Sequence, residues 1–168
     1  MTVTSEVGKG TTVTLYFPEA LGVAPEPAAH TPAADSHGSG QHVLFLDDEQ
    51  ALVELGMRIL SRGGYRVSGY GRVEEALRAF KADPGAIDVV VVDYHMPGAT
   101  GIALAKDVLA LRPDLPVILA SGRVTEAMEI EAAANGIRDV LPKPYTAAEL
   151  SRVVGAACRA AAGGGPTA

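Results

Sequence analysis

The sequence predicts an α/β protein, a doubly wound (βα)5 chain whose five-stranded parallel sheet is covered by helices on both faces. Two observations lead to this prediction. From residue 42 onward, short apolar runs alternate five times with segments whose apolar residues recur at helical spacing. The runs lack the strict alternation of a sheet with one solvated face, so we expect strands that are buried on both faces, as in parallel sheets.

Each predicted strand is a short apolar run bounded by turn residues. The run "HVLFL" opens the set, and "IDVVVV", with four valines in succession, follows the turn pair Pro84-Gly85. The five strands are expected over residues 42–46, 65–70, 87–92, 115–121 and 137–142.

Each predicted helix is defined by its apolar spacing and by residues suited to its ends. In the second helix Val73, Ala76, Leu77 and Phe80 recur at helical spacing. Glycines close the first and fourth helices, and Thr146 is suited to cap the N-terminus of the fifth. The five helices are expected over residues 49–64, 73–83, 101–113, 125–136 and 146–161.

Composition divides the chain into a main domain and flanking segments. Residues 1–17 indicate two short alternating strands around the turn Gly8-Lys9-Gly10. Residues 18–41 are rich in Pro, Ala, Gly and Ser without an apolar period, which is typical of a flexible linker. The domain is expected over 42–160, and residues 161–168 are expected to form a disordered tail.

Charge and hydropathy exclude several classes of function. The formal net charge is -6 and the sequence pI is near 5.1, which argues against a nucleic-acid-binding protein. No apolar run reaches the roughly 18 residues that a membrane-spanning helix needs, so no membrane segment is expected. The single Cys158 suits a reducing compartment. These features predict a cytoplasmic location.

Charged and polar residues follow four of the predicted strands. Asp47-Asp48 follow the first strand, Asp93 the third, Ser121 ends the fourth, and Lys143 follows the fifth. The carboxyl ends of parallel strands meet at one edge of an open α/β sheet, where such folds bind ligands. Three carboxylates at one edge repel one another, and either a raised pKa or a bound cation relieves that repulsion.

The type of cation follows from the ligands. Carboxylate oxygens favour Mg²⁺ or Mn²⁺ over zinc, and the sequence has no His/Cys cluster at zinc spacing. A single Asp at a strand end is ordinary turn chemistry. Four strand ends of one chain with this combination instead indicate a cation-dependent site.

These residues resemble a known family. The segments "VLFLDDE", "VVVVDYHMPGATG", "PVILASG" and "LPKP" are similar, in the family order, to the response-regulator receiver domain of two-component signalling. The resemblance implies a flavodoxin-like fold with strand order 2-1-3-4-5. It also implies a domain that accepts a phosphoryl group from a phosphohistidine and catalyses only its own phosphorylation and dephosphorylation.

The resemblance assigns roles to individual residues. Asp93 would be the phosphoacceptor, and Asp48 a direct ligand of Mg²⁺ (or Mn²⁺) that Asp47 assists through water. The backbone carbonyl of His95 would be a further metal ligand. Ser121 would then bond a phosphoryl oxygen.

The same resemblance covers the end of the fifth strand and the switch. Lys143 would pair with the phosphoryl group, and its peptide to Pro144 would be cis. His95 and Arg123 occupy positions that tune the phosphoryl lifetime in the family. Val140 stands where receivers often carry a Tyr or Phe that turns inward on activation, so the switch is expected to be altered.

The N-terminal segment carries a second resemblance. "SEVGKGTTVTLYFP" is similar to the last hairpin of a histidine-kinase ATP-binding domain, which implies that the chain is the C-terminal part of a hybrid sensor kinase and that residues 1–17 are a remnant. A phosphate-binding P-loop is excluded because Lys9 is followed by Gly10 instead of Ser or Thr. The other elements of a kinase have no counterpart in this sequence.

The resulting hypothesis is a Mg²⁺-dependent receiver that takes a phosphoryl group from a histidine kinase or phosphotransfer domain onto Asp93. Two alternatives stay open: a single-domain docking module that does not need phosphorylation, and an aspartyl-phosphate-type phosphatase. The phosphatase ranks lowest because it needs an Asp at position 95, where this chain has His. The face built from 125–161 is also expected to dock partners or a second copy of the chain.

Overall fold

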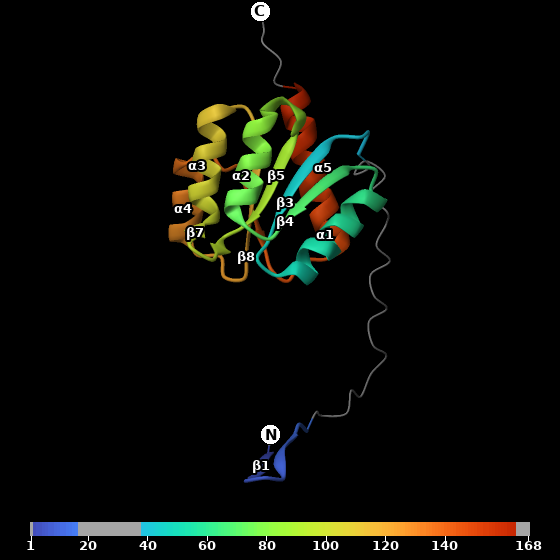
Figure 1. Ribbon diagram of the computed structural model, residues 1–168, viewed down its shortest axis with the longest axis vertical. Helices are drawn as coiled ribbons and strands as arrows, with labels where there is room; N and C mark the ends of the chain where they lie inside the picture. Colours follow the sequence, from blue (N-terminus) through green and yellow to red (C-terminus); the bar gives the residue numbers. More distant parts are fainter. Residues whose placement is uncertain (1, 17–37, 164–168) are drawn as a thin grey trace, which may run out of the picture. The chain divides into compact units, whose positions relative to one another are not determined.

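The computed structural model of the protein describes residues 2–16 and 38–163, which belong to two separate units (Figure 1). The predicted linker (18–41) lies outside these residues up to residue 37, and the predicted tail (161–168) lies outside them from residue 164 onward. Residues 161–163, predicted as part of the tail, instead form the end of the helix α5 (Ala147–Gly163), whereas the linker over 18–37 and the tail over 164–168 remain predictions.

The first unit contains an antiparallel hairpin. Its strands are β1 (Thr2–Glu6) and β2 (Gly10–Thr14), and the turn between them uses Gly8 and Gly10 at φ of 80° and 99°. L-residues with a side chain rarely adopt such angles, so the glycines permit this turn. All residues of both strands are exposed.

The second unit contains a five-stranded parallel sheet. Its order is β4-β3-β5-β8-β9, which is 2-1-3-4-5 in the order of the predicted strands, and the prediction is confirmed. The strands are β3 (His42–Leu46), β4 (Arg66–Tyr70), β5 (Val89–Asp93), β8 (Val117–Ser121) and β9 (Asp139–Pro142).

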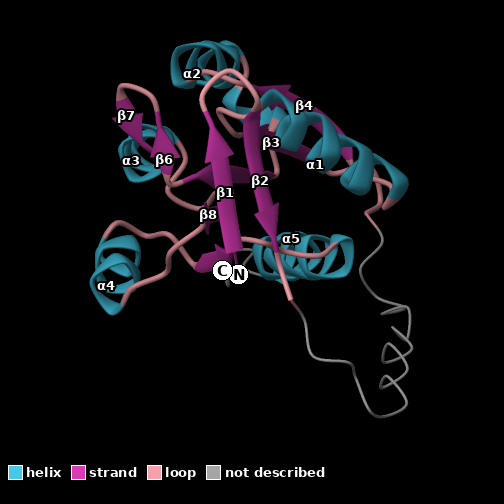
Figure 2. Ribbon diagram, turned by 90° about the horizontal axis from the view of Figure 1, so that it is seen from below, coloured by secondary structure: helices cyan, strands magenta, loops and turns pink. Residues whose placement is uncertain are grey.

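Helices cover both faces of this sheet, so that the unit has three layers (Figure 2). One face carries the first and last helices of the unit, and the other face carries the three between them. The helices are α1 (Gln50–Arg62), α2 (Val73–Ala82), α3 (Gly101–Leu111), α4 (Glu126–Ala134) and α5 (Ala147–Gly163).

Successive residues of each central strand point to opposite layers. On β3, Val43 and Phe45 belong to the core cluster shared with α1 and α5, whereas Leu44 and Leu46 belong to the cluster shared with α2, α3 and α4. All four residues are at most 1% exposed. This two-sided burial explains why the predicted strands are continuously apolar.

Two short elements were not predicted. A 3₁₀ helix, η1, covers Pro84–Ala86, and a small hairpin of β6 (His95–Met96) and β7 (Ala99–Thr100) follows β5. The hairpin turns at Gly98, whose φ is 80°. Elements of two or three residues are too short to produce an apolar period.

Helix ends follow the capping chemistry of their residues. Thr146 and Glu149 form a reciprocal pair: Thr146 Oγ1 accepts the N–H of Glu149 (3.2 Å), and Glu149 Oε2 accepts the N–H of Thr146 (2.7 Å). The end of α4 uses Ile137, which donates its N–H to Ala132 O (3.0 Å). The fifth strand consequently begins at Asp139, two residues later than predicted.

Residues 38–41, which composition assigns to the linker, bond to the second unit. Gly38 N donates to Gly63 O (2.7 Å), and Gly40 N donates to Gly64 O (3.1 Å). The ordered domain therefore begins before β3.

Candidate functional site

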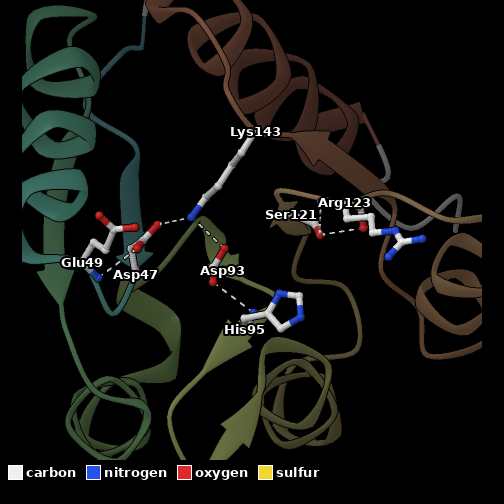
Figure 3. A network of polar contacts seen from close by, with 7 residues as sticks. All are labelled: Asp47, Glu49, Asp93, His95, Ser121, Arg123 and Lys143. Atoms are coloured by element: carbon white, nitrogen blue, oxygen red, sulfur yellow. Dashed lines mark hydrogen bonds and ion pairs between the residues drawn. The ribbon is translucent and has the colours of Figure 1, made fainter. Parts of the chain in front are cut away.

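The ammonium group of Lys143 links the ends of two strands. Its Nζ lies 2.5 Å from Oδ2 of Asp47, which follows β3, and 2.7 Å from Oδ1 of Asp93, the last residue of β5 (Figure 3). Lys143 itself follows β9. The parallel sheet brings these three residues together because their strands all end at the same edge.

The second oxygen of each carboxylate accepts a backbone hydrogen bond. Asp47 Oδ1 accepts the N–H of Glu49 (3.0 Å), and Asp93 Oδ2 accepts the N–H of His95 (3.0 Å). Asp47 is 1% exposed and Asp93 is 6% exposed. Buried carboxylates with both oxygens bonded have a fixed orientation, so Asp93 presents its carboxylate in one direction.

The charges at this edge do not balance. Lys143 supplies one positive charge to two buried carboxylates, so one formal negative charge remains. Burial lowers the pKa of Lys143, but the hydrogen bonds and charges of Asp47 and Asp93 outweigh burial and raise the pKa above the usual lysine value. Lys143 is therefore firmly protonated at neutral pH.

Ser121, at the end of β8, bonds within its own loop. Its hydroxyl donates to Arg123 O (3.0 Å) and accepts the N–H of Arg123 (3.2 Å), and the residue is 0% exposed. Figure 3 shows this pair apart from the Lys143 network. The structure thus places Ser121 at the predicted edge but gives its hydroxyl a partner in the following loop.

Asp48 and the other carboxylates differ in their surroundings. Asp48 is exposed, whereas Asp47 and Asp93 are buried. Among residues 2–16 and 38–163, no three His, Cys, Asp or Glu side chains are gathered closely enough to hold a metal ion. The oxygen ligands named from the sequence have the chemistry that Mg²⁺ prefers, and the formal negative charge that Lys143 does not balance also favours a cation.

The remaining switch positions lie around this edge. The peptide between Lys143 and Pro144 is cis, as the resemblance implies. Val140 on β9 is half-buried against the core on the α4 side. The exposed His95 packs edge-on against the ring of Tyr94, with centroids 4.7 Å apart.

Tyr145 is a neighbour of the site that the sequence analysis missed. It is half-buried against the core cluster beneath α5. Burial raises the pKa of its phenol, the nearby charge of Lys143 lowers it, and the charges of Asp47 and Asp93 raise it further. Its position directly after Lys143-Pro144 was the only signal in the sequence.

Comparison with known proteins identifies the family of the chain that carries this site. The family model for the response regulator receiver domain matches residues 43–155, which is more than half of the chain and contains every residue of the Lys143 network. The chain belongs to the response regulator receiver family.

Individual relatives agree with this assignment. This receiver is 37% identical over 108 residues to the C4-dicarboxylate transport transcriptional regulatory protein DctD of Rhizobium meliloti, covering 64% of the chain and 23% of DctD. It is 32% identical over 158 residues to the sensor kinase CckA of Brucella abortus, covering 89% of the chain but only 17% of CckA. The receiver chain thus spans less than a quarter of these two relatives.

A solved receiver has the same fold. The response regulator receiver domain protein from Clostridium thermocellum aligns with a TM-score of 0.68 and 28% identity, covering 71% of this chain and 95% of that one. Receiver domains take phosphoryl groups from histidine kinases and generally use Mg²⁺ to do so. In the described part of the receiver chain, no helix has the length and hydropathy to span a bilayer.

Proposed function

We propose that Asp93 is the phosphoacceptor of this receiver and that Lys143 is the cation that accompanies the transfer. The observation that carries the proposal is the shared ammonium group: Lys143 Nζ touches both Asp47 and Asp93, the two buried carboxylates of the edge. A carboxylate that is buried at a ligand-binding edge, fixed in direction and paired with a cation is suited to nucleophilic attack on phosphorus.

In the proposed step, an oxygen of Asp93 attacks the phosphorus atom of a phosphohistidine. The new oxygen–phosphorus bond forms as the phosphorus–nitrogen bond of the donor breaks, and the imidazole leaves with its electron pair and takes a proton from solvent. The N–H of His95 keeps the carboxylate oriented during attack. Lys143, already 2.7 Å from Oδ1, stabilises the negative charge of the phosphoryl oxygens.

The proposed ligands of Mg²⁺ are Asp48 and Asp93 directly, the carbonyl of His95, and Asp47 through water. When bound, the ion supplies positive charge to the transferring oxygens. The negative charge that Lys143 leaves at Asp47 and Asp93 supports this assignment. Of the three aspartates, Asp48 is exposed, whereas Asp47 and Asp93 are buried.

Ser121 is proposed to bond the phosphoryl group after transfer. Its hydroxyl at present forms two bonds with the backbone of Arg123, so a new bond to the phosphoryl group requires that the loop release it. The loop from Gly122 to Thr125 leads directly into α4, and its movement would shift that helix.

Intact-mass measurement tests the assignment of Asp93. The full chain is incubated with acetyl phosphate and Mg²⁺, and we expect a single base-labile phosphoryl group that is absent from Asp93→Asn and absent without Mg²⁺. Asp107→Asn, an exposed aspartate on α3, is the matched control and should label normally. Equal labelling of wild type and Asp93→Asn would show that Asp93 is not the acceptor.

We also propose that the chain is the C-terminal part of a hybrid sensor kinase. The alignment with the sensor kinase CckA supports this, since it covers 89% of the chain and so extends beyond the receiver at 43–155. The hairpin of β1 and β2 would then close the ATP-binding domain. The reading frame upstream of Met1 tests the idea, because it should encode the remainder of that ATP-binding domain.

A pairing of two receivers is proposed for the face of α4, β9 and α5. The first turn of α4 carries Glu126 and Glu129, while exposed Arg138 and Arg152 lie by β9 and on α5, so that two copies can oppose unlike charges. Sedimentation with and without beryllofluoride tests this. A docking module that does not depend on phosphorylation would have the same mass with and without beryllofluoride. The cytoplasmic location of the chain remains a prediction.

A further inference from the structure

The segment Gly38–Gln41 is bound along the amino end of β4. Gly38 N and Gly40 N donate to the carbonyls of Gly63 and Gly64, and Gln41 O accepts the N–H of Arg66 (2.9 Å). The side chain of Arg66 adds a bond from Nε to Gly40 O (3.1 Å). Three backbone bonds and one side-chain bond therefore hold these four residues against residues 63–66, directly upstream of the first paired residues of β3 and β4, His42 and Arg66.

Two glycines make the close approach of this segment feasible. A Cβ on Gly38 would lie 2.6 Å from Cδ1 of Tyr65, and a Cβ on Gly64 would lie 2.6 Å from Gly38 O. Gly64 also has φ of 86°, which side chains rarely allow. The segment and residues 63–66 are thus in direct van der Waals contact, and each of the two contributes a glycine where a side chain would not fit.

The segment covers Tyr65, which is only 5% exposed. Tyr65 belongs to the core cluster that contains Val154 and Ala157 of α5, and Cys158 packs against the same cluster. Burial raises the pKa of Tyr65, and the charge of Cys158 raises it further, which agrees with their proximity. A continuous path of packed side chains therefore runs from Gly38 through Tyr65 to the second half of α5.

We propose that residues 38–41 form a docking strap: an interaction surface at 63–66 binds this segment of the same chain and couples the upstream part of the chain to α5. While the strap is bound, Tyr65 is covered from solvent and α5 packs against the core cluster that contains Tyr65. When the strap leaves, Tyr65 loses its cover and the core beneath α5 loosens. The strap lies at the start of β3, opposite the edge that carries Asp93, so this coupling is separate from the phosphoryl site.

Amide exchange in the full chain tests whether the strap is bound. The N–H groups of Gly38 and Gly40 should exchange at least about tenfold more slowly than unstructured amides, because each is the donor of a bond to the domain. Unprotected amides at both positions would overturn the proposal.

Alkylation of Cys158 tests the coupling to α5. Gly38→Val places a side chain against Tyr65 and should release the strap, whereas Ser39→Ala is the matched control because the structure uses only the backbone N–H of Ser39. Iodoacetamide should alkylate Cys158 about tenfold faster in Gly38→Val and at the wild-type rate in Ser39→Ala.

A milder variant covers the case in which Gly38→Val fails to fold. Arg66→Met removes only the Nε bond to Gly40 from an exposed residue and keeps most of the side chain. It should raise the exchange rate of the Gly40 amide and the alkylation rate of Cys158 together. If either variant releases the strap but leaves the alkylation rate of Cys158 unchanged, the proposed coupling to α5 is wrong, whatever the exchange data show about binding of the strap.

Discussion

The α-carbon of Gly101 lies against the backbone carbonyl of Asp93, so closely that a Cβ on residue 101 would overlap the carbonyl oxygen. The same glycine donates its N–H to Tyr94 O (2.9 Å) and begins α3. The start of this helix and the end of β5 are therefore packed backbone to backbone. The absence of a side chain at position 101 permits this close approach to the backbone of Asp93.

Gly101→Ala should destabilise the receiver by about 1–3 kcal/mol, because the added methyl group forces the backbone of Asp93 to move. Urea denaturation measures the effect, and labelling by acetyl phosphate should slow as well. Gly85→Ala is the control, since its Cβ would lie 3.5 Å from its nearest neighbour, Asp83 Oδ1, and should change stability by no more than about 0.5 kcal/mol. A similar loss in both variants would contradict the argument.

Lys143→Met should stay folded but lose roughly 2–4 kcal/mol of stability, because it leaves two buried carboxylates without their cation. Asp47→Asn should recover part of this loss in the Lys143→Met background, and denaturation of the four proteins in the cycle gives the coupling. Phosphorylation should fall in Lys143→Met.

The contribution of Lys143 also has a predicted pH dependence. Because the folded-state pKa of Lys143 is raised, its contribution is complete below the ordinary lysine pKa of about 10.4 and is lost only as the pH rises through the higher folded value. The stability difference between wild type and Lys143→Met should thus be constant from about pH 7 to 9. A difference that vanishes within that range would argue against the ion pair.

Cys158 should be a slow thiol in the folded chain. Burial raises its pKa to about 11, and the charge of Asp88 contributes. The thiolate is the reactive form, so alkylation at pH 8 should be about 100-fold slower than expected for a thiol of pKa 9, and the rate should rise with pH until about 11. The raised pKa also means that neutral Cys158 favours the fold below the ordinary thiol pKa, and that this contribution fades as the pH passes through about 11. Fast alkylation of the folded chain at pH 8, without urea, would show that burial does not raise the pKa of the Cys158 thiol.

Ser121→Ala should still accept a phosphoryl group but fail to move the loop that follows β8. Chemical-shift mapping with beryllofluoride should show changes over residues 121–135 in the wild type and little change over 138–141, because Val140 is stiff and too short to swing between two positions. The variant should lose most of the changes. If strand β9 responds as strongly as the loop, the inference from Val140 is wrong.

The sequence predicted the order of elements and the sheet edge that carries the polar residues. Apolar runs were sufficient for this because a parallel sheet covered on both faces needs consecutive apolar residues. Val90 and Val91, for example, are both buried but in opposite layers. The strand order came from the family resemblance, since periodicity does not specify which strands are neighbours.

The partners of individual polar groups were not predictable from local pattern. The contact between Lys143 and Asp47 joins residues 96 positions apart, and it depends on how both strands end. Ser121 bonds to Arg123 because of the backbone path of its loop, which no residue type specifies. Ile137 reads as the start of a strand but instead completes the end of α4, because its N–H is needed by the carbonyl of Ala132.

The hairpin of β1 and β2 has one further consequence for work with this protein. Within the described residues each of its strands pairs only with the other, so a row of N–H and C=O groups is unpaired on both outer edges. Val3 and Val13 are each 54% exposed on this ribbon. Exposed edges with apolar side chains are templates for intermolecular strand addition. We therefore expect the chain to self-associate at high concentration through its first residues, and a chain shortened to begin after Tyr16 to stay dispersed.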